Sequence, residues 1–569
     1  MHYTSLYSPP PPTPVVNLHD FVFDSPAYNE PDKVIFIEPL AGRQWYRDEV
    51  RQRINEGATA LVTPEADGGF GLSPDGELVA VMSTNCVEYI LLAHALFKTT
   101  NPLVLIPSGA TAFELEHFLS VSTATRLFVH ASLLPIALTV TKKLGFPDSR
   151  IYVLSGDPQS GRRDLMSAMD EIRRRNIPHV PSKPVKDDTL LYLVFSSGTS
   201  GLPKAVMLSH KNTIASMVEV AHAAAGDDPH PFFEKNPPIG LGFLPIYHTY
   251  GLHFICIRPV WTATAVILIP RWNADLVLDL IPKYRINVVP FTPPAILQLV
   301  NHRRIREVDL SSLVSMGSGA SHLPPKVANA FTRLAKNVGR VNEGFGMSEC
   351  TVSATRACPE SKFGGPRPGS TGVLLPGVEA RIVRDDGTLA GADEPGELWL
   401  RGDIIALGYW RNPKATAETF VDGWLRTGDR FRVDRDQHFF FVERIKDVLK
   451  VSGQQVSPTE LENVLLACPD RLVADVAVAG VHAPGTRLAD ERVPRAWVVL
   501  SDAGSRRGAD AAVRALDAWI RTSLSKFKWL RGGIAVVDEI PKNPTGKVLR
   551  RVLVQQYEEQ LKTAPQAKL

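Results

Sequence analysis

Short apolar runs and amphipathic stretches alternate along much of the chain. LLYLVFS at 190–196 and NVVPFT at 287–292 are typical of buried strands. FELEHFLSV at 113–121 and PKVANAFTRLAKNV at 325–338 space their apolar residues as helices do. Because strand-like and helical stretches follow one another, the pattern predicts an α/β fold with layered sheets.

The pattern changes near residue 443, and a smaller α+β region follows. Ser457 and Glu460 have the spacing of a capping box at the start of a helix. Two alternating runs, 473–481 and 495–501, then precede an amphipathic helix at 510–524. We therefore predict two domains, a large one at 1–444 and a small one at 445–569.

The N-terminus and the most apolar stretch of the chain are distinct in composition. The N-terminal MHYTSLYSPPPPTP lacks the features of a signal peptide, and its prolines predict an extended, poorly ordered lead-in. The most apolar stretch, 254–270, is short for a membrane span and contains Arg258 and Pro259. We interpret it as a buried helix followed by a strand.

The composition of the chain limits the classes of partner that we expect. A chain of 569 residues with 44% hydrophobic and 22% charged residues is long enough for more than one domain. Its formal charge of +3 gives no indication of a nucleic-acid or membrane-surface partner, so we expect a small-molecule partner. The five scattered cysteines lack paired spacing and are interpreted as reduced structural thiols, with no metal cluster.

The stretch VFSSGTSGLPKAV at 194–206 indicates phosphate binding, because hydroxyls and glycines follow an apolar run and precede a lysine. It is not the P-loop of NTPases, since Pro203 stands before Lys204 and Ala205 after it.

Seven ordered segments together resemble the adenylate-forming superfamily, which includes acyl-CoA synthetases, 4-coumarate-CoA ligases, beetle luciferases and nonribosomal adenylation domains. The segments are SSGTSGLPKAVMLSH (196–210), LPIYHTYGL (244–252), GSGASHLP (317–324), NEGFGMSE (342–349), PGELWLRGDIIALGYWRNPKAT (395–416), 423–462 and IPKNPTGKVLRR (540–551). The resemblance implies a large multi-subdomain N-terminal domain and a small mobile C-terminal domain that rotates about a hinge near Lys446.

The family's chemistry explains the residue types. A carboxylate attacks the α-phosphorus of ATP and pyrophosphate leaves, so the site must neutralise developing negative charge. The resemblance assigns phosphate binding to a loop that ends at Lys204. The loop's other members are Ser196, Ser197, Gly198, Thr199 and Ser200.

The segment NEGFGMSE supplies nucleotide and metal contacts in the resemblance. Gly344 and Phe345 would form the adenine wall, Ser348 would contact the α-phosphate, and Glu349 would bind Mg²⁺ as a carboxylate ligand. Glu343 departs from the family, in which many members carry an amide here, but its carboxylate still accepts from the adenine amine. Further nucleotide contacts implied are Ala320, Lys446 and the ribose-binding pair Asp429 and Arg444.

The small domain carries residues for two successive half-reactions. Lys547 matches the lysine that reaches the carboxylate and α-phosphate during adenylation. Lys450 and Gln455 match residues presented after rotation, when the thioester forms.

The acid and CoA sites complete the implied set. His248 matches a histidine at the junction of the acid pocket and the thiol tunnel. Tyr250 and Ser321 would line the acid pocket. For CoA, the resemblance implies Arg271 together with Ser452 and Gly453, although Ser452 stands where lysine is common.

The preferred function is an ATP-, CoA- and Mg²⁺-dependent carboxylic acid–CoA ligase acting on an aryl or phenylpropenoic acid. This choice of acid depends on the likeness of 288–300 and YHTYGL to 4-coumarate-CoA ligases. A medium-chain fatty acid stays open, because an apolar pocket discriminates poorly between similar shapes. Less favoured alternatives are a luciferase-like enzyme, a carrier-protein-loading adenylation domain and a catalytically inactive relative.

The last three residues, Ala567, Lys568 and Leu569, resemble the tripeptide read by the peroxisomal import receptor. A peroxisomal location is therefore an expectation, with the cytoplasm as the alternative.

Overall fold

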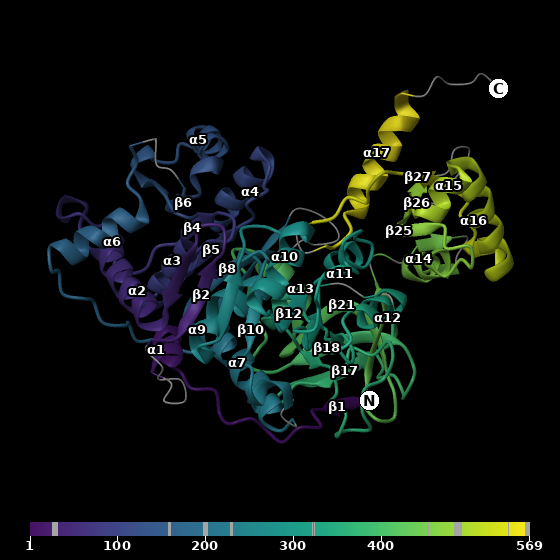
Figure 1. Cartoon of the computed structure of the whole chain (residues 1–569), viewed down its shortest axis with the longest axis horizontal. Coiled ribbons are helices and arrows are strands. Elements are labelled where there is room, and N and C mark those ends of the chain that lie inside the picture. The colour runs from purple at the N-terminus through teal and green to yellow at the C-terminus, as the bar shows by residue number, and fades with distance from the viewer. Residues whose placement is uncertain are drawn as a thin grey trace. The chain divides into compact units, whose positions relative to one another are not determined.

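The computed structural model describes the chain except for residues 25–31, 157–160, 197–202, 228–230, 321–322, 324, 446, 448, 452–453, 483–491, 544–545 and 564–569. The described residues form two compact units. The large unit comprises Met1–Thr427 and Arg432–Phe440, and the small unit comprises Gly428–Phe431 and Phe441–Leu569. Figure 1 follows the elements of both along the chain.

Two seven-stranded sheets form the framework of the large unit. The first has the order β14 (Asn342–Glu343), β13 (Ser315–Ser318), β12 (Val288–Phe291), β10 (Ile239–Gly242), β11 (Ala265–Leu268), β2 (Val34–Glu38) and β3 (Arg43–Tyr46). The second has the order β19 (Gly408–Tyr409), β9 (Lys204–Ser209), β8 (Leu190–Ser196), β5 (Leu103–Ile106), β4 (Val79–Met82), β6 (Arg126–Val129) and β7 (Ile151–Val153). Most neighbouring pairs are parallel, as expected of strands joined by helical crossovers.

A continuous hydrophobic core joins the two sheets. Helix α3 (Val87–Lys98) contributes to it and is buried on nearly every face. It shares the core with Phe36 of the first sheet and Val79 and Leu103 of the second. A helix that is apolar all round must be enclosed by other elements, so α3 fixes the spacing of the layers.

A third sheet in the chain has the order β1 (His2–Thr4), β17 (Glu379–Val383), β18 (Gly396–Arg401), β21 (Trp424–Val433) and β20 (Phe420–Val421), with β22 (Phe439–Arg444) paired to β21. Its first strand corrects the prediction of a poorly ordered lead-in. His2, Tyr3 and Thr4 pair antiparallel with β17, and the Ser5 hydroxyl donates to the Leu374 carbonyl at 3.0 Å. The prolines after Ser8 belong to no helix or strand, but backbone pairing before them holds the segment in place.

The apolar stretch 254–270 forms a buried helix and strand, as predicted. A π-helix (Leu252–Ile257) continues into α9 (Arg258–Thr262), and β11 follows. Within the part of the chain that the structure describes, no helix has the length and apolarity needed to span a bilayer.

The small unit has the α+β composition expected of it. Strands β25 (Val473–His482), β26 (Arg492–Leu500) and β27 (Ile534–Val536) form one sheet, and β23 (Leu449–Val451) pairs with β24 (Gln454–Val456) in a hairpin. Helices α14 (Pro458–Leu466) and α16 (Ala509–Ser523) pack on its core, and α17 (Arg550–Thr563) closes the described chain.

The capping box predicted for α14 is only half formed. Ser457 accepts from the Glu460 backbone N–H at 3.4 Å, but the Glu460 carboxylate accepts from Lys528 Nζ at 2.6 Å. The ion pair with Lys528 therefore replaces the reciprocal bond to the cap.

Candidate active site

The motif loops of the large unit follow the carboxyl ends of parallel strands. The phosphate loop follows β8, the LPIYHTYGL segment follows β10, and GSGASHLP and NEGFGMSE include the ends of β13 and β14. In open α/β sheets ligands bind outside these strand ends. Segments that are far apart in the sequence therefore all lie at carboxyl ends of parallel strands.

The phosphate loop connects two antiparallel strands. Ser196 ends β8 and is the register partner of Lys204, which begins β9. The predicted apolar strand before the loop is confirmed. The remaining predicted loop residues, Ser197, Gly198, Thr199 and Ser200, lie outside the described residues.

Lys204 and Glu349 are linked through Tyr409. The Lys204 Nζ lies 4.7 Å from the centroid of the Tyr409 ring, and the Tyr409 hydroxyl donates to Glu349 Oε1 at 2.9 Å. Burial and the neighbouring Glu349 carboxylate raise the pKa of Tyr409, so its hydroxyl remains a donor at neutral pH. Glu349 itself is only 5% exposed.

Sequence reasoning missed Tyr409 as a functional residue. It lies within the family-like segment 395–416, but nothing local shows which side chain it contacts. The pairing of β19 with β9 brings it beside Lys204, because Tyr409 is the register partner of Val206.

The predicted adenine wall is a closely packed backbone segment. A Cβ on Gly344 would stand 2.9 Å from the Thr355 carbonyl oxygen, so a side chain does not fit there. The Phe345 N–H donates to the Thr355 hydroxyl at 2.9 Å, and that hydroxyl donates to the Thr371 carbonyl at 2.8 Å. Thr355 thus fixes both residues that the motif assigns to adenine.

Glu343 and Ala320 lie at the ends of neighbouring strands. Burial raises the pKa of Glu343 to about 7, although the Leu323 N–H donates to its Oε2 at 3.3 Å. Ala320 has a φ of 72°, an uncommon backbone conformation for a residue with a Cβ. Ser321, assigned to the acid pocket, lies outside the described residues.

His248 begins the helical segment that carries the predicted acid wall. It is the N-cap of α8 (Thr249–Gly251), and burial lowers its pKa to about 4, so the ring is neutral at physiological pH. Its buried Nε2 has no hydrogen-bond partner among the described residues. The next residue, Thr249, directs its hydroxyl to Ser348 Oγ at 3.5 Å, which places His248 near the residue assigned to the α-phosphate.

Tyr250 lies against the glycine-rich end of β13. A Cβ on Gly319 would stand 3.4 Å from the Tyr250 ring, and one on Gly317 would stand 4.0 Å from its hydroxyl. Tyr250 is half-buried, and burial raises the pKa of its hydroxyl. The structure therefore brings Tyr250 and the GSGA segment together, as the acid-pocket prediction requires.

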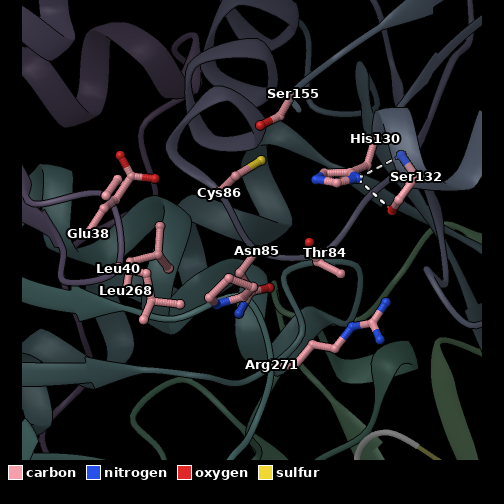
Figure 2. Close-up of a pocket in the computed structure, with 12 residues that line it drawn as sticks. Glu38, Leu40, Thr84, Asn85, Cys86, His130, Ser132, Ser155, Leu268 and Arg271 are labelled. Carbon is pink, nitrogen blue, oxygen red and sulfur yellow. Dashed lines mark hydrogen bonds between the residues drawn. The ribbon is translucent and has the colours of Figure 1, made fainter. Parts of the chain in front are cut away.

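Arg271 lines a separate pocket of about 380 Å³, shown in Figure 2. Thr84 lies between Arg271 and His130, and the Ser132 backbone N–H donates to His130 Nδ1 at 3.2 Å. Asn85, also in the wall, accepts from the Ile246 N–H at 3.0 Å and donates to the Leu244 carbonyl at 2.9 Å. The hydrogen bonds of Asn85 therefore connect this pocket to the segment 244–252, which carries His248.

In the small unit, Asp429 and Arg444 lie on neighbouring strands. Arg444 Nε lies 3.2 Å from Asp429 Oδ1, and Asp429 is 3% exposed. The pair assigned to the ribose is therefore assembled. Lys446 lies outside the described residues.

The two residues assigned to thioester formation are also brought together. Lys450 and Gln455 are direct partners in the register of the β23–β24 hairpin. Ser452 and Gly453, assigned to CoA, lie outside the described residues. Lys547 precedes Val548, which forms an antiparallel bridge with Lys542, and the Lys547 N–H donates to Asn543 Oδ1 at 2.8 Å.

The same segments match known families. The model of the AMP-binding enzyme family matches residues 23–410, and that of the AMP-binding enzyme C-terminal domain matches residues 460–547. The chain belongs to the AMP-binding enzyme family.

Relatives of this AMP-binding enzyme are named as acid–CoA ligases. Acyl-CoA ligase AKT1 of Alternaria alternata is 32% identical over 563 residues, which cover 94% of this chain and 93% of the relative. 4-coumarate–CoA ligase 1 of Arabidopsis thaliana is 33% identical over 377 residues, 66% of this chain and 64% of the relative. The solved structure of the anthranilate CoA ligase AuaEII in complex with anthranoyl-AMP has a TM-score of 0.81 and 25% identity, covering 97% of this chain and 99% of that one.

These comparisons show that the chain is an AMP-forming acid–thiol ligase of the acyl-CoA synthetase branch. The enzyme joins a carboxylic acid to CoA at the expense of ATP.

Proposed function

We propose that the acid is an aryl or phenylpropenoic acid, activated as acyl-AMP with release of pyrophosphate and then transferred to CoA with release of AMP. The observation that carries this proposal is the position of Tyr250. Its ring meets Phe254 edge-on at 5.0 Å and adjoins Gly319, so aromatic faces border the predicted acid pocket. Planar acids stack favourably on such faces.

The residues of the large unit suit the first half-reaction. In this proposal Lys204 supplies positive charge for the phosphates, and the Ser348 hydroxyl donates to the α-phosphate. Glu349 fits a hard cation, because its buried carboxylate is oriented by Tyr409 and offers oxygen ligands. Bound there, Mg²⁺ would neutralise charge on the leaving pyrophosphate.

The residues of the small unit divide between the two half-reactions in our proposal. Asp429 and Arg444 would hold the ribose hydroxyls. Lys547 would contact the acid carboxylate and α-phosphate during adenylation, whereas Lys450 and Gln455 would act after a rotation of this unit. Direct pairing of Lys450 with Gln455 supports a common role for them.

For the second half-reaction we propose that His248 borders the route of the CoA thiol and that Arg271 contacts a CoA phosphate. The pocket lined by Arg271 supports this assignment, because its lining combines a guanidinium with the hydroxyls of Thr84 and Ser132, which are donors for an anion.

A pyrophosphate-release screen over benzoic, cinnamic and C6–C12 alkanoic acids, with and without CoA, tests the proposal. We expect cinnamic acids to give the highest kcat/KM, with CoA thioester as the final product. Tyr250→Ala should raise the KM for 4-hydroxycinnamate far more than the KM for ATP, while thermal stability is kept. Preference for decanoate over every aryl acid would reject the aryl assignment and favour the medium-chain alternative.

A further inference from the structure

Three side chains form a row along the helical segment that borders the acid pocket. The rings of Tyr250 and Phe254 meet edge-on with centroids 5.0 Å apart. The Arg258 guanidinium carbon lies 4.5 Å from the centroid of the Phe254 ring. The row therefore runs from the glycine-rich end of β13, which Tyr250 contacts, to a positive charge one helical turn beyond Phe254.

The half-buried residues recur at every fourth position from Tyr250 to Arg258. Tyr250, Phe254 and Arg258 are each half-buried, whereas His253 and Ile257 between them are fully buried. Phe254 therefore connects Tyr250 to the guanidinium along the partly exposed side of the segment.

Arg258 is a cation without a counter-ion in the described part of the chain. No hydrogen bond or ion pair of its side chain is found there, and its Nε is buried without a partner. Two titratable groups that interact with it, Tyr250 and His253, are neutral, because burial raises the pKa of Tyr250 and lowers that of His253. Burial also lowers the pKa of Arg258 to about 10, which still leaves it charged at neutral pH.

A buried arginine elsewhere in this enzyme has charged and polar partners. Arg126 has a side chain that is 5% exposed, and it donates to Glu77 at 3.1 Å and to the Tyr152 hydroxyl at 2.8 Å. A buried charge is costly unless it is paired. The fold pairs Arg126 with Glu77, whereas Arg258 has no ion-pair partner among the described residues.

We propose that the acid substrate supplies this partner: it carries a second oxygen acceptor at its distal end, a carboxylate in preference to a hydroxyl, and Arg258 binds it. This inference rests on the proposed function, because it requires Tyr250 to border the acid pocket. A guanidinium binds a carboxylate through two parallel charge-assisted hydrogen bonds, whereas a hydroxyl accepts a single weaker one. An acid that ends in a methyl group or bare ring would leave the guanidinium unpaired.

Four cinnamic acids that differ at one ring position test the inference: cinnamate and its 4-methyl, 4-hydroxy and 4-carboxy derivatives. Pyrophosphate release is measured for each with ATP and CoA present. We expect wild-type kcat/KM for the 4-carboxy acid to exceed that for the 4-methyl acid by about 10- to 100-fold, with the 4-hydroxy acid between them. Dodecanedioate and dodecanoate form a matched aliphatic pair with the same expected order.

Substitution of Arg258 separates binding from structure. Arg258→Met should reverse the preference for the 4-carboxy acid while kcat/KM for the 4-methyl acid stays within about threefold. Arg258→Lys retains a charge and should restore part of the preference, because lysine provides a point charge rather than a planar fork. Arg43→Met is the control, since Arg43 also lies over an aromatic ring, that of Trp45, at 3.5 Å, and should change nothing.

The possible outcomes are distinct. If wild-type enzyme activates cinnamate or dodecanoate at least as well as the acid with a distal carboxylate, the inference is wrong and the proposed ligase of aryl or medium-chain acids stands. If no acid of either series is activated, both fall. Equal loss for all acids in Arg258→Met would assign Arg258 a structural role only. Should that variant fail to fold, the wild-type order of acids decides.

Discussion

Tyr409→Phe removes one hydroxyl and keeps the ring. The hydroxyl donates to Glu349 Oε1 at 2.9 Å, and the ring lies beneath Lys204 Nζ. The variant therefore deprives the proposed metal ligand of the bond that orients it, while the contact with Lys204 is retained.

The expected magnitude follows from burial and charge. Glu349 is 5% exposed, so water is poorly placed to replace the lost donor. A hydrogen bond to a charged group contributes about 1.5–3 kcal/mol, which corresponds to a decrease of about 10- to 150-fold in kcat/KM for MgATP. Tyr409→Leu also removes the ring and should lose a further ~0.5–2 kcal/mol of the interaction with Lys204.

The assay is pyrophosphate release at varied MgATP with saturating acid. Tyr46→Phe is the matched control, because Tyr46 is 44% exposed and lies in β3. Melting temperatures of both variants should stay within about 3 °C of wild type, which separates a site effect from unfolding. Wild-type kcat/KM for MgATP in Tyr409→Phe would refute the role given to this hydroxyl.

Three further predictions concern the small unit and pH. Lys547→Ala should lower pyrophosphate release by about 10²- to 10³-fold, yet leave preformed acyl-AMP able to react with CoA; wild-type release would contradict its assignment. Lys450→Ala and Gln455→Ala should do the converse and let acyl-AMP accumulate in a quenched-flow assay, whereas equal loss of both half-reactions would argue against the rotation. Burial raises the pKa of Glu343 to about 7, so its contribution to stability is present below the unfolded pKa near 4.5 and is lost as pH rises towards 7. Glu343→Gln should therefore match wild type in thermal melts at pH 4.5 and exceed it at pH 8, by at most about 3 kcal/mol in the free energy of unfolding; a pH-independent difference would contradict this.

The sequence allowed good prediction where the signal is local or motif-based. Hydrophobic periodicity predicts three features that the structure contains: the strand before the phosphate loop, the buried helix and strand at 254–270, and the α+β region after 443. The N-terminal strand was missed, because its order depends on pairing with Glu379–Arg381, which no local pattern shows.

In the candidate site, too, motifs reveal some residues and only tertiary contacts reveal others. Glu349 and Lys204 were found through motifs, but the tyrosine between them was not, since its role arises from a pairing between distant strands. Arg258 was noticed only as a charge within an apolar stretch. The lack of a hydrogen-bond partner for its Nε among the described residues is a property of three-dimensional packing that no spacing of residues reveals.

The pairing of β19 with β9 has a consequence for how the enzyme acquires activity. Beyond the register pair of Tyr409 and Val206, the Trp410 N–H donates to the Ala205 carbonyl at 2.8 Å, so two segments about 200 residues apart in the chain close one site. Such non-local contacts are costly in loop-closure entropy and tend to form slowly. During synthesis Lys204, the lysine proposed to bind phosphate, emerges long before Tyr409, which lies beside it in the folded chain. We therefore expect nucleotide binding to be a late event in folding. By binding only when β19 is paired with β9, ATP would stabilise the folded chain over its partly folded forms.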